Sequence, residues 1–289
     1  MTEERPVSYN IADLAWPDIQ RYTSKDGIVL IPVGSIEQHG PHLPVGTDMY
    51  HCQEVAERAA PLANVLYAPT QPYGYSPHHI RKAGTGQGTI TLTAAATQAL
   101  YYDIGRSLIH MGFTKLIYIN GNASNFKVMD PVMRRLKYET GAFVVVYKPY
   151  GENYMGLMDD VLEAPRDETP GWHSAEQETS QMMAHDPKLV HMDRLEGKWE
   201  KSHKPDWLPD AFGKSDGFHT IQFQGFEYFY VPFEHDDYSA SGIVGNPLPA
   251  RAEKGDIIYD RFAQYLADAI VEFRKIPVEV RNVEFTNRT

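Results

Sequence analysis

The sequence predicts an α/β fold built on a parallel sheet, and three observations support this prediction. Short apolar runs rich in β-branched and aromatic residues alternate with longer segments of helical periodicity, which is the pattern of a parallel sheet covered by helices. The chain has 289 residues, of which 42% are apolar, and this is enough for a sizeable core. No internal repeat or low-complexity segment breaks the alternation. We therefore expect a single domain over residues 1–289.

Four runs of residues have the composition of strands. They are GIVLIPVG at 27–34, NVLYAPT at 64–70, KLIYING at 115–121 and AFVVVYK at 142–148. Each is rich in the β-branched and aromatic side chains that favour a pleated, half-buried surface. We expect these four runs to form the sheet, with helices between them.

Helical spacing of apolar residues marks the segments that should cover the sheet. Five helices are expected, over residues 48–60, 93–111, 126–138, 175–184 and about 249–273. The second of them opens with Thr93, a residue type that often caps a helix N-terminus. The last helix has the clearest pattern, with apolar residues at Ile257, Ile258, Phe262, Tyr265, Leu266 and Ile270.

Residues 186–248 form an aromatic-rich region without a clean period, so we expect loops or a hairpin over the sheet. This region is where substrate selectivity should reside. Five aromatic residues in or near it could form walls for a polar ring, although core packing is the expected role for most of them: Trp172, Trp207, Phe226, Tyr228 and Tyr230.

The charge of the chain narrows the class of partner. With 27 basic and 38 acidic residues the net charge is −11, and no Lys/Arg run offers a footprint for phosphates. We therefore expect a small-molecule substrate rather than nucleic acid or a membrane surface. No apolar stretch reaches the roughly 18 residues of a membrane span, and the N-terminus lacks the features of a secretion signal, so a cytoplasmic location is expected.

The segment GSIEQHGPHLPVGTD, residues 34–48, is unusually rich in acidic residues, histidine, proline and glycine for the end of a strand. Glu37 and His39 follow the carboxyl end of the first strand, where open α/β sheets bind their ligands, and Asp48 begins the next helix. Two carboxylates and an imidazole suit Zn²⁺ or Mn²⁺. Spacing alone leaves other roles open, namely a helix cap for Asp48, an arginine partner for Glu37 and a core position for His39.

Two later segments bring more polar side chains to the same edge. YINGNASN at 118–125 supplies Asn122, Ser124 and Asn125 after the third strand, and HSAEQETS at 173–180 supplies histidine and glutamate at the start of a helix. Turn or helix-cap chemistry is the expected role of Asn125. Simpler roles also exist in HSAEQETS. His173 could be a surface cap, and Glu176 could lie on a solvated helix face, which is the role that we expect for Glu176.

These motifs resemble those of the creatininase (creatinine amidohydrolase) family. The matching segments are PVGSIEQHGPHLPVGTD, NGNASN, HSAEQETS and GIVGNPLPARAEKG at 242–255, in the family's order and spacing from residue 27 to about 270. The resemblance implies a three-layer α/β/α sandwich with a mostly parallel sheet. It also implies a homo-oligomer, often a hexamer, and a hydrolytic site with two Zn²⁺ or Mn²⁺ ions.

The resemblance also implies roles for individual residues. Asp48 resembles the carboxylate that bridges both metals, while Glu37 and His39 resemble ligands of one metal each. Glu178 resembles the acidic residue of the third motif, and His173 resembles the histidine that moves protons during ring opening.

The chain departs from the family pattern at several positions. Asn122 stands where the family has a histidine ligand, and Ser124 stands where creatininase itself has a glutamate. SPHHIRKAGTGQGTITL, residues 76–92, is similar to another family segment but with a few residues inserted. We expect the metal ligands to be Glu37, His39, Asp48, Asn122 and Glu178. Because an amide oxygen binds Zn²⁺ less well than imidazole, one firmly held ion is expected, bound by His39, Asp48 and Glu178.

The expected activity is metal-dependent hydrolysis, of the amidohydrolase type, on a small polar cyclic amide or related carbonyl compound. Glu37 or Glu178 would take a proton from the activated water, and His173 would pass a proton to the leaving group. Together with a third motif that reads His-Ser-Ala where the family has His-Ala-Gly, these departures from the family pattern argue against the creatininase reaction itself. Three alternatives remain: hydrolysis of a carbon–carbon bond in an inositol-derived cyclic diketone, isomerisation of a keto sugar, and a binding protein without catalysis.

Overall fold

The computed structural model describes residues 5–149, 154–164, 173–201, 204–213, 220–286 and 288. At its centre is a parallel sheet with strand order β2-β1-β3-β4. The strands are β1 (Ile28–Val33), β2 (Leu66–Tyr67), β3 (Lys115–Asn120) and β4 (Phe143–Tyr147). All four expected strands are present. β2 is shorter than predicted because the register shifts after it: Ala68 N donates to Leu30 O, but the next bonds with the β1 side join Gln71 N to Pro32 O and Gly34 N to Gln71 O.

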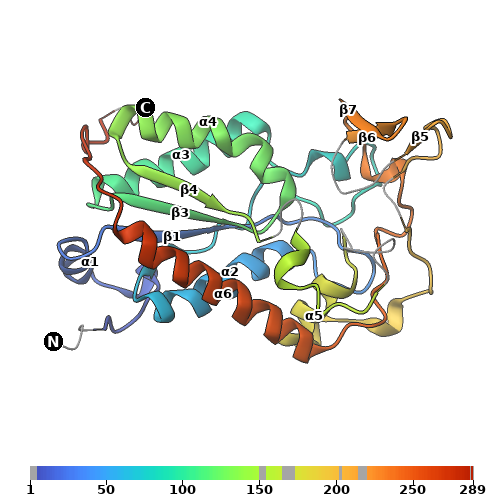
Figure 1. Ribbon diagram of the computed structural model, residues 1–289, viewed down its shortest axis with the longest axis horizontal. Helices are drawn as coiled ribbons and strands as arrows, with labels where there is room; N and C mark the ends of the chain where they lie inside the picture. Colours follow the sequence, from blue (N-terminus) through green and yellow to red (C-terminus); the bar gives the residue numbers. More distant parts are fainter. Residues whose placement is uncertain are drawn as a thin grey trace.

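Helices cover both faces of this sheet (Figure 1), which confirms the predicted three-layer sandwich. Helices α2 (Thr47–Ala63) and α6 (Ala252–Arg274) pack on one face, and α3 (Ala94–His110) and α4 (Ala123–Thr140) pack on the other. Side chains alternate along β1, as a strand buried on both faces requires. Ile28 and Leu30 enter the first core, and Val29, Ile31 and Val33 enter the second.

The remaining helices are shorter. They are α1 (Trp16–Thr23), which was not predicted and buries none of its residues, and α5 (Glu176–His185). Thr93 caps α3 as expected, since its side chain accepts a hydrogen bond of 3.2 Å from Ala96 N. The buried face of α6 includes Ile258, Phe262, Leu266 and Ile270, whereas the predicted apolar positions Ile257 and Tyr265 are exposed.

Single turns of 3₁₀-helix connect these elements. They are η1 (Ile11–Asp13), η2 (Pro77–His79), η3 (Tyr154–Leu157), η4 (Pro187–Leu189), η5 (Met192–Arg194) and η6 (His235–Asp237). Among the helices that the structure describes, none combines the length and the apolar character needed to cross a membrane.

The aromatic-rich region forms a second, antiparallel sheet at one end of the molecule (Figure 1). Its strands are β5 (Phe212–Gly213), β6 (Thr220–Phe223) and β7 (Phe226–Tyr230). The expected core packing of its aromatic residues is wrong, because the side chains of Trp207, Phe226, Tyr228 and Tyr230 are all more than half exposed. A three-stranded sheet buries little, and its core is the small cluster of Leu208, Ile221 and Phe233. Trp172 lies outside the described residues.

Candidate metal centre

Two glycines allow the start of α2 to pack against the ends of the central strands. A Cβ atom on Gly34, just after β1, would lie 2.5 Å from Met49 Cα, and one on Gly121, just after β3, would lie 2.2 Å from Asp48 O. No side chain fits in either place. This close approach sets Asp48, in the first turn of α2, directly beside the carboxyl ends of β1 and β3.

The loop after β1 turns Glu37 and His39 into the same space. Glu37 N donates to Val45 O at 2.9 Å, which closes the loop, and Gly40 supplies the left-handed turn with φ of 61°. His39 Nδ1 donates to Glu37 O at 3.0 Å, and this bond fixes the ring and directs Nε2 toward Asp48. Both side chains are almost fully buried, at 3% and 1% exposure.

Glu178 reaches the same space from the first turn of α5. The chain enters this helix through Ser174, whose left-handed φ of 60° is unusual for a residue with a side chain. Ser174 N donates to Glu178 Oε2, so the strained turn holds the carboxylate in place. His42 Nε2 also lies 3.0 Å from Thr179 Oγ1 and joins the loop after β1 to this helix.

His39, Asp48 and Glu178 form a compact set of ligand atoms, which we call the acidic end of the site. His39 Nε2 lies 3.3 Å from Asp48 Oδ1 and 3.7 Å from Glu178 Oε2. It is buried without a hydrogen-bond partner in the described part of the chain. One imidazole nitrogen and two carboxylate oxygens pointing at one another are a donor set that fits Zn²⁺ or Mn²⁺.

The electrostatics of the acidic end agree with this fit. Burial opposes a charge on His39, but the carboxylates of Asp48 and Glu178 raise the pKa of its imidazole to about 10. Burial, together with the negative charge of Asp48, raises the pKa of Glu178 to about 7. Burial and the charge of Glu37 likewise raise the pKa of Asp48. Three carboxylates this close favour a cation among them.

Asn122 is brought to the site as predicted, but its amide faces the carboxylates with its NH₂ group. Nδ2 donates to Glu37 Oε2 and to Asp48 Oδ2, both at 2.9 Å. Its oxygen accepts from Ser124 N at 2.8 Å and caps α4. In this arrangement Asn122 donates hydrogen bonds to the two carboxylates instead of offering an oxygen ligand.

Glu37 faces a second group of side chains with its other oxygen. Its Oε1 lies 3.4 Å from His79 Nε2 and 3.8 Å from His173 Nδ1. Burial would raise the pKa of Glu37, but the imidazoles of His79, His39 and His173 hold it well below the usual value. Together with His235, the residues His79 and His173 form what we call the imidazole end of the site.

His79 and His235 belong to the site but were not identified from the sequence. His79 lies in the segment 76–92, which was noted only for its likeness to a known motif, and His235 lies in the region without periodicity. A cleft of 900 Å³ opens beside them, with Gln38, His79 and His235 in its wall. The aperiodic region therefore does border the site, as expected, although its exposed aromatic residues do not line this cleft.

Two expectations about neighbouring residues are wrong. Glu176 is fully buried, not solvated, because its carboxylate pairs with Lys254 of α6 and accepts hydrogen bonds from the backbone N–H groups of Glu163 and Ala164. Asn125 does not cap α4. Its side chain joins the loop at Tyr75 to the end of β1, since Oδ1 accepts from Tyr75 N at 2.8 Å and Nδ2 donates to Gly34 O at 2.9 Å.

Known proteins resemble this chain over nearly its whole length. The family model for creatininase, described as creatinine amidohydrolase, matches residues 12–270. Creatinine amidohydrolase of Pseudomonas putida is 28% identical over 91% of this chain and 96% of its own. 3-Dehydro-scyllo-inosose hydrolase of Thermotoga maritima is 26% identical over 91% of this chain and 83% of its own.

Solved structures agree with the sequence relatives. A structure titled as creatininase with Mn superposes with a TM-score of 0.70 at 26% identity and covers 93% of this chain and 100% of its own. A creatininase mutant of Zn–Zn type gives a TM-score of 0.68 at 27% identity, with 94% and 100% coverage. The predicted choice of Zn²⁺ or Mn²⁺ agrees with these neighbours and with the donor set described above. With a matching family model over 12–270 and hydrolases as its relatives, the chain belongs to the creatininase family.

Proposed function

We propose that this protein is a metal-dependent hydrolase of a small polar cyclic amide or related carbonyl compound. The observation that carries the proposal is the acidic end, where His39 Nε2 is buried, has no hydrogen-bond partner among the described residues, and points at the carboxylates of Asp48 and Glu178. These three residues would hold one divalent ion. Asn122 is assigned a donor role beside it, because its oxygen already caps α4.

An ion bound there supplies Lewis acidity, which polarises a carbonyl group and lowers the pKa of a water molecule toward neutrality. The protein's own groups handle the protons. Glu37 would be the acceptor: its low pKa keeps it ionised at neutral pH, and Asn122 links it directly to Asp48. In lactam hydrolysis the oxygen of water bonds to the carbonyl carbon, the C–N bond breaks, and the nitrogen takes up a proton.

The predicted proton delivery by His173 depends on a single ring nitrogen. Its Nε2 donates to the backbone carbonyl of Gln38 at 2.7 Å, which leaves Nδ1 facing Glu37 at 3.8 Å. Burial and the neighbouring His39 lower the pKa of His173 well below the usual value, so Nδ1 carries a lone pair at neutral pH. Nδ1 can therefore receive a proton from Glu37 and pass it on, or it can bind a cation, but it cannot do both at once.

A second candidate is hydrolysis of a carbon–carbon bond in a cyclic diketone. The specific observation in its favour is the relative named 3-dehydro-scyllo-inosose hydrolase, which matches 91% of this chain. The same residues serve both reactions, because each needs a polarised carbonyl and a proton delivered to the departing atom. The difference would lie in the groups that line the cleft.

We further propose that the protein works in the cytoplasm as a homo-oligomer, a hexamer by family resemblance. Family membership supports the assembly, and the net charge of −11 fits a small-molecule enzyme that avoids nucleic acids and anionic membranes. The mass in solution, measured by light scattering, tests the oligomeric state.

The experiment that tests the activity is a turnover screen of lactams, formamides, cyclic diketones and keto sugars, run with the wild-type protein and with Asp48→Ala. Hydrolysis of a lactam or formamide by the wild-type protein alone would support the first candidate. Hydrolysis confined to a diketone would favour the second. Isomerisation of a keto sugar without hydrolysis of any compound, or equal turnover by Asp48→Ala, would overturn the proposal.

A further inference from the structure

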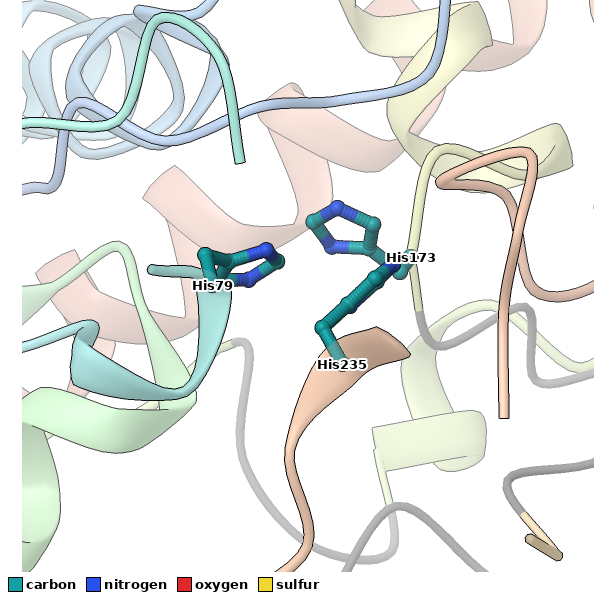
Figure 2. A group of neighbouring side chains, drawn as sticks. All are labelled: His79, His173 and His235. Carbon is teal, nitrogen blue, oxygen red and sulfur yellow. The ribbon is translucent and has the colours of Figure 1, made fainter. Parts of the chain in front are cut away.

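Three histidines from separate segments converge at the imidazole end of the site (Figure 2). His79 ends η2, His173 precedes α5 and His235 begins η6. Their ring centroids are 4.4–5.1 Å apart, and each ring offers one nitrogen within 4.8 Å of the others. All three are buried, with exposures of 3%, 7% and 6%. Such a cluster is uncommon in a core, where a polar ring normally satisfies its nitrogens separately.

Gln38 organises the three rings. Its Nε2 donates toward His79 Nδ1 at 3.3 Å and toward His235 Nε2 at 3.0 Å. An amide NH₂ only donates, so both of these ring nitrogens hold lone pairs that accept from Gln38, and an ion bound by them would take the place of the amide. The backbone carbonyl of Gln38 accepts from His173 Nε2, which leaves the lone pair of that ring on Nδ1. A ring N–H donated to a backbone carbonyl is the usual second bond of a metal-binding histidine.

The surroundings favour a cation near the rings. The charged group facing the cluster from the acidic end is Glu37, whose Oε1 lies 3.4 Å from His79 Nε2. On the cleft side, Gln38, His79 and His235 lie in the wall, so a ligand held by the rings would be accessible to small molecules.

We propose that His79, His173 and His235 bind a second divalent ion, Zn²⁺, on the cleft side of the acidic end. Three histidines with a fourth position open to water or substrate are a known ligand set of catalytic zinc. Zn–N bonds of about 2.0–2.1 Å place the ligand nitrogens roughly 3.3 Å apart, so the cluster would tighten on binding. Imidazole suits Zn²⁺, whereas Mn²⁺ prefers carboxylate oxygens.

This second ion changes two expectations from the sequence. The expectation of one firmly held ion rests on Asn122 alone and takes no account of His79 and His235, which face the site. With an ion at the imidazole end, His173 is a ligand, and the proton for the leaving group comes from Glu37. The proposal builds on the proposed function at the same site, yet it concerns residues that the acidic end does not use.

Ion content of the full chain tests the proposal. The chelated protein is dialysed against Zn²⁺ or Mn²⁺, freed of excess metal and analysed by mass spectrometry for ions per chain. Wild-type protein should hold two Zn²⁺ ions but one Mn²⁺ ion. His79→Gln and His235→Gln should each hold one Zn²⁺ ion and keep a wild-type circular dichroism spectrum. His78→Gln, which changes the neighbouring ring outside the cluster, should still hold two.

His39→Gln separates this proposal from the proposed function. It should lose the ion of the acidic end and keep the Zn²⁺ ion of the imidazole end, while the double variant with His235→Gln should hold none. A wild-type protein with a single Zn²⁺ ion that His235→Gln retains and His39→Gln loses would overturn the second site and leave the proposed function standing. Failure of the proposed function would appear instead as unchanged ion content in His39→Gln.

Discussion

The two ends of the site meet at Glu37, which lies between them, but they differ in chemistry and in how the fold builds them. The acidic end combines two carboxylates with one imidazole, and its ligands lie in the loop after β1 and in the first turns of α2 and α5. The imidazole end has three nitrogen ligands, held by connecting segments around Gln38. Helices thus carry the charged ligands, while loops supply imidazole ligands next to the cleft.

Removing the imidazole of the acidic end should have the largest effect. His39→Ala takes away one ligand and leaves Asp48 and Glu178 facing each other, so we expect loss of the ion of the acidic end and of turnover to background, with the fold retained. Ion content, kcat and the circular dichroism spectrum measure the three outcomes. His42→Gln is the matched control, because His42 is equally buried but bonds Thr179 and belongs to neither end.

Full activity in an ion-free His39→Ala protein would refute the acidic end as a metal centre. Loss of the ion in His42→Gln as well would mean that the loop after β1, not the ligand itself, controls binding.

Replacing His173 tests whether its ring binds an ion of the imidazole end or transfers a proton. His173→Asn should lower kcat by roughly 10²–10⁴-fold, which is the usual contribution of a correctly placed acid–base group. We expect the loss of one Zn²⁺ ion with it, because Nδ1 belongs to the imidazole end. Unchanged ion content with the same fall in kcat, and less effect on substrates with better leaving groups, would assign Nδ1 to proton transfer instead. Near-normal turnover with about 1 kcal/mol lost in stability would leave His173 only the structural role of its hydrogen bond to Gln38 O.

Two glutamates of α5 separate stability from metal binding. Glu176 is buried against Lys254, and removing one partner of such a pair costs about 3–5 kcal/mol, so Glu176→Gln should lower the free energy of unfolding by that amount. Its ion content should remain that of the wild-type protein. Glu178→Gln should show the reverse, with a lost ion and a smaller change in stability. Urea unfolding and metal analysis of both variants decide the matter, and loss of metal in Glu176→Gln would contradict the division.

Replacing Asn122 should have the smallest effect of these substitutions. Asn122→Asp replaces two donated hydrogen bonds to Glu37 and Asp48 with a third carboxylate, so the chelated protein should lose about 1.5–3 kcal/mol of stability. Added Zn²⁺ should raise the Tm of this variant more than that of the wild-type protein, because the ion offsets the added repulsion. Asn122→Ala, which removes the donors without adding charge, is the control. Equal stability of Asn122→Asp and the wild-type protein in chelator would contradict the donor role.

Much of the acidic end could be predicted because its signals are local. Glu37, His39 and Asp48 follow one apolar strand within fifteen residues, and strand ends of a parallel sheet meet at one edge. The strands and helices around them followed from periodicity for the same reason. Glu176 was misjudged because its partner Lys254 lies on a different helix, which helical spacing cannot reveal.

The imidazole end was missed because no spacing connects its members. His79, His173 and His235 are far apart in the sequence and lie in short connecting segments without a hydrophobic period. The orientation of the Asn122 amide depends on which backbone N–H groups and carboxylates surround it, and this too follows only from the folded chain. The exposure of the aromatic residues on β7 reflects a sheet too small to bury them.

The most direct test of the central claim follows turnover and ion content in one sample through removal and return of the metal. The purified chain is assayed on the lactam, formamide and diketone panel, then chelated, assayed again, and reconstituted with Zn²⁺ or Mn²⁺. We predict hydrolysis of at least one compound, its loss in step with the ions, and its recovery when either ion returns to the acidic end. Turnover that persists at full rate in protein shown to be free of divalent ions would contradict the account.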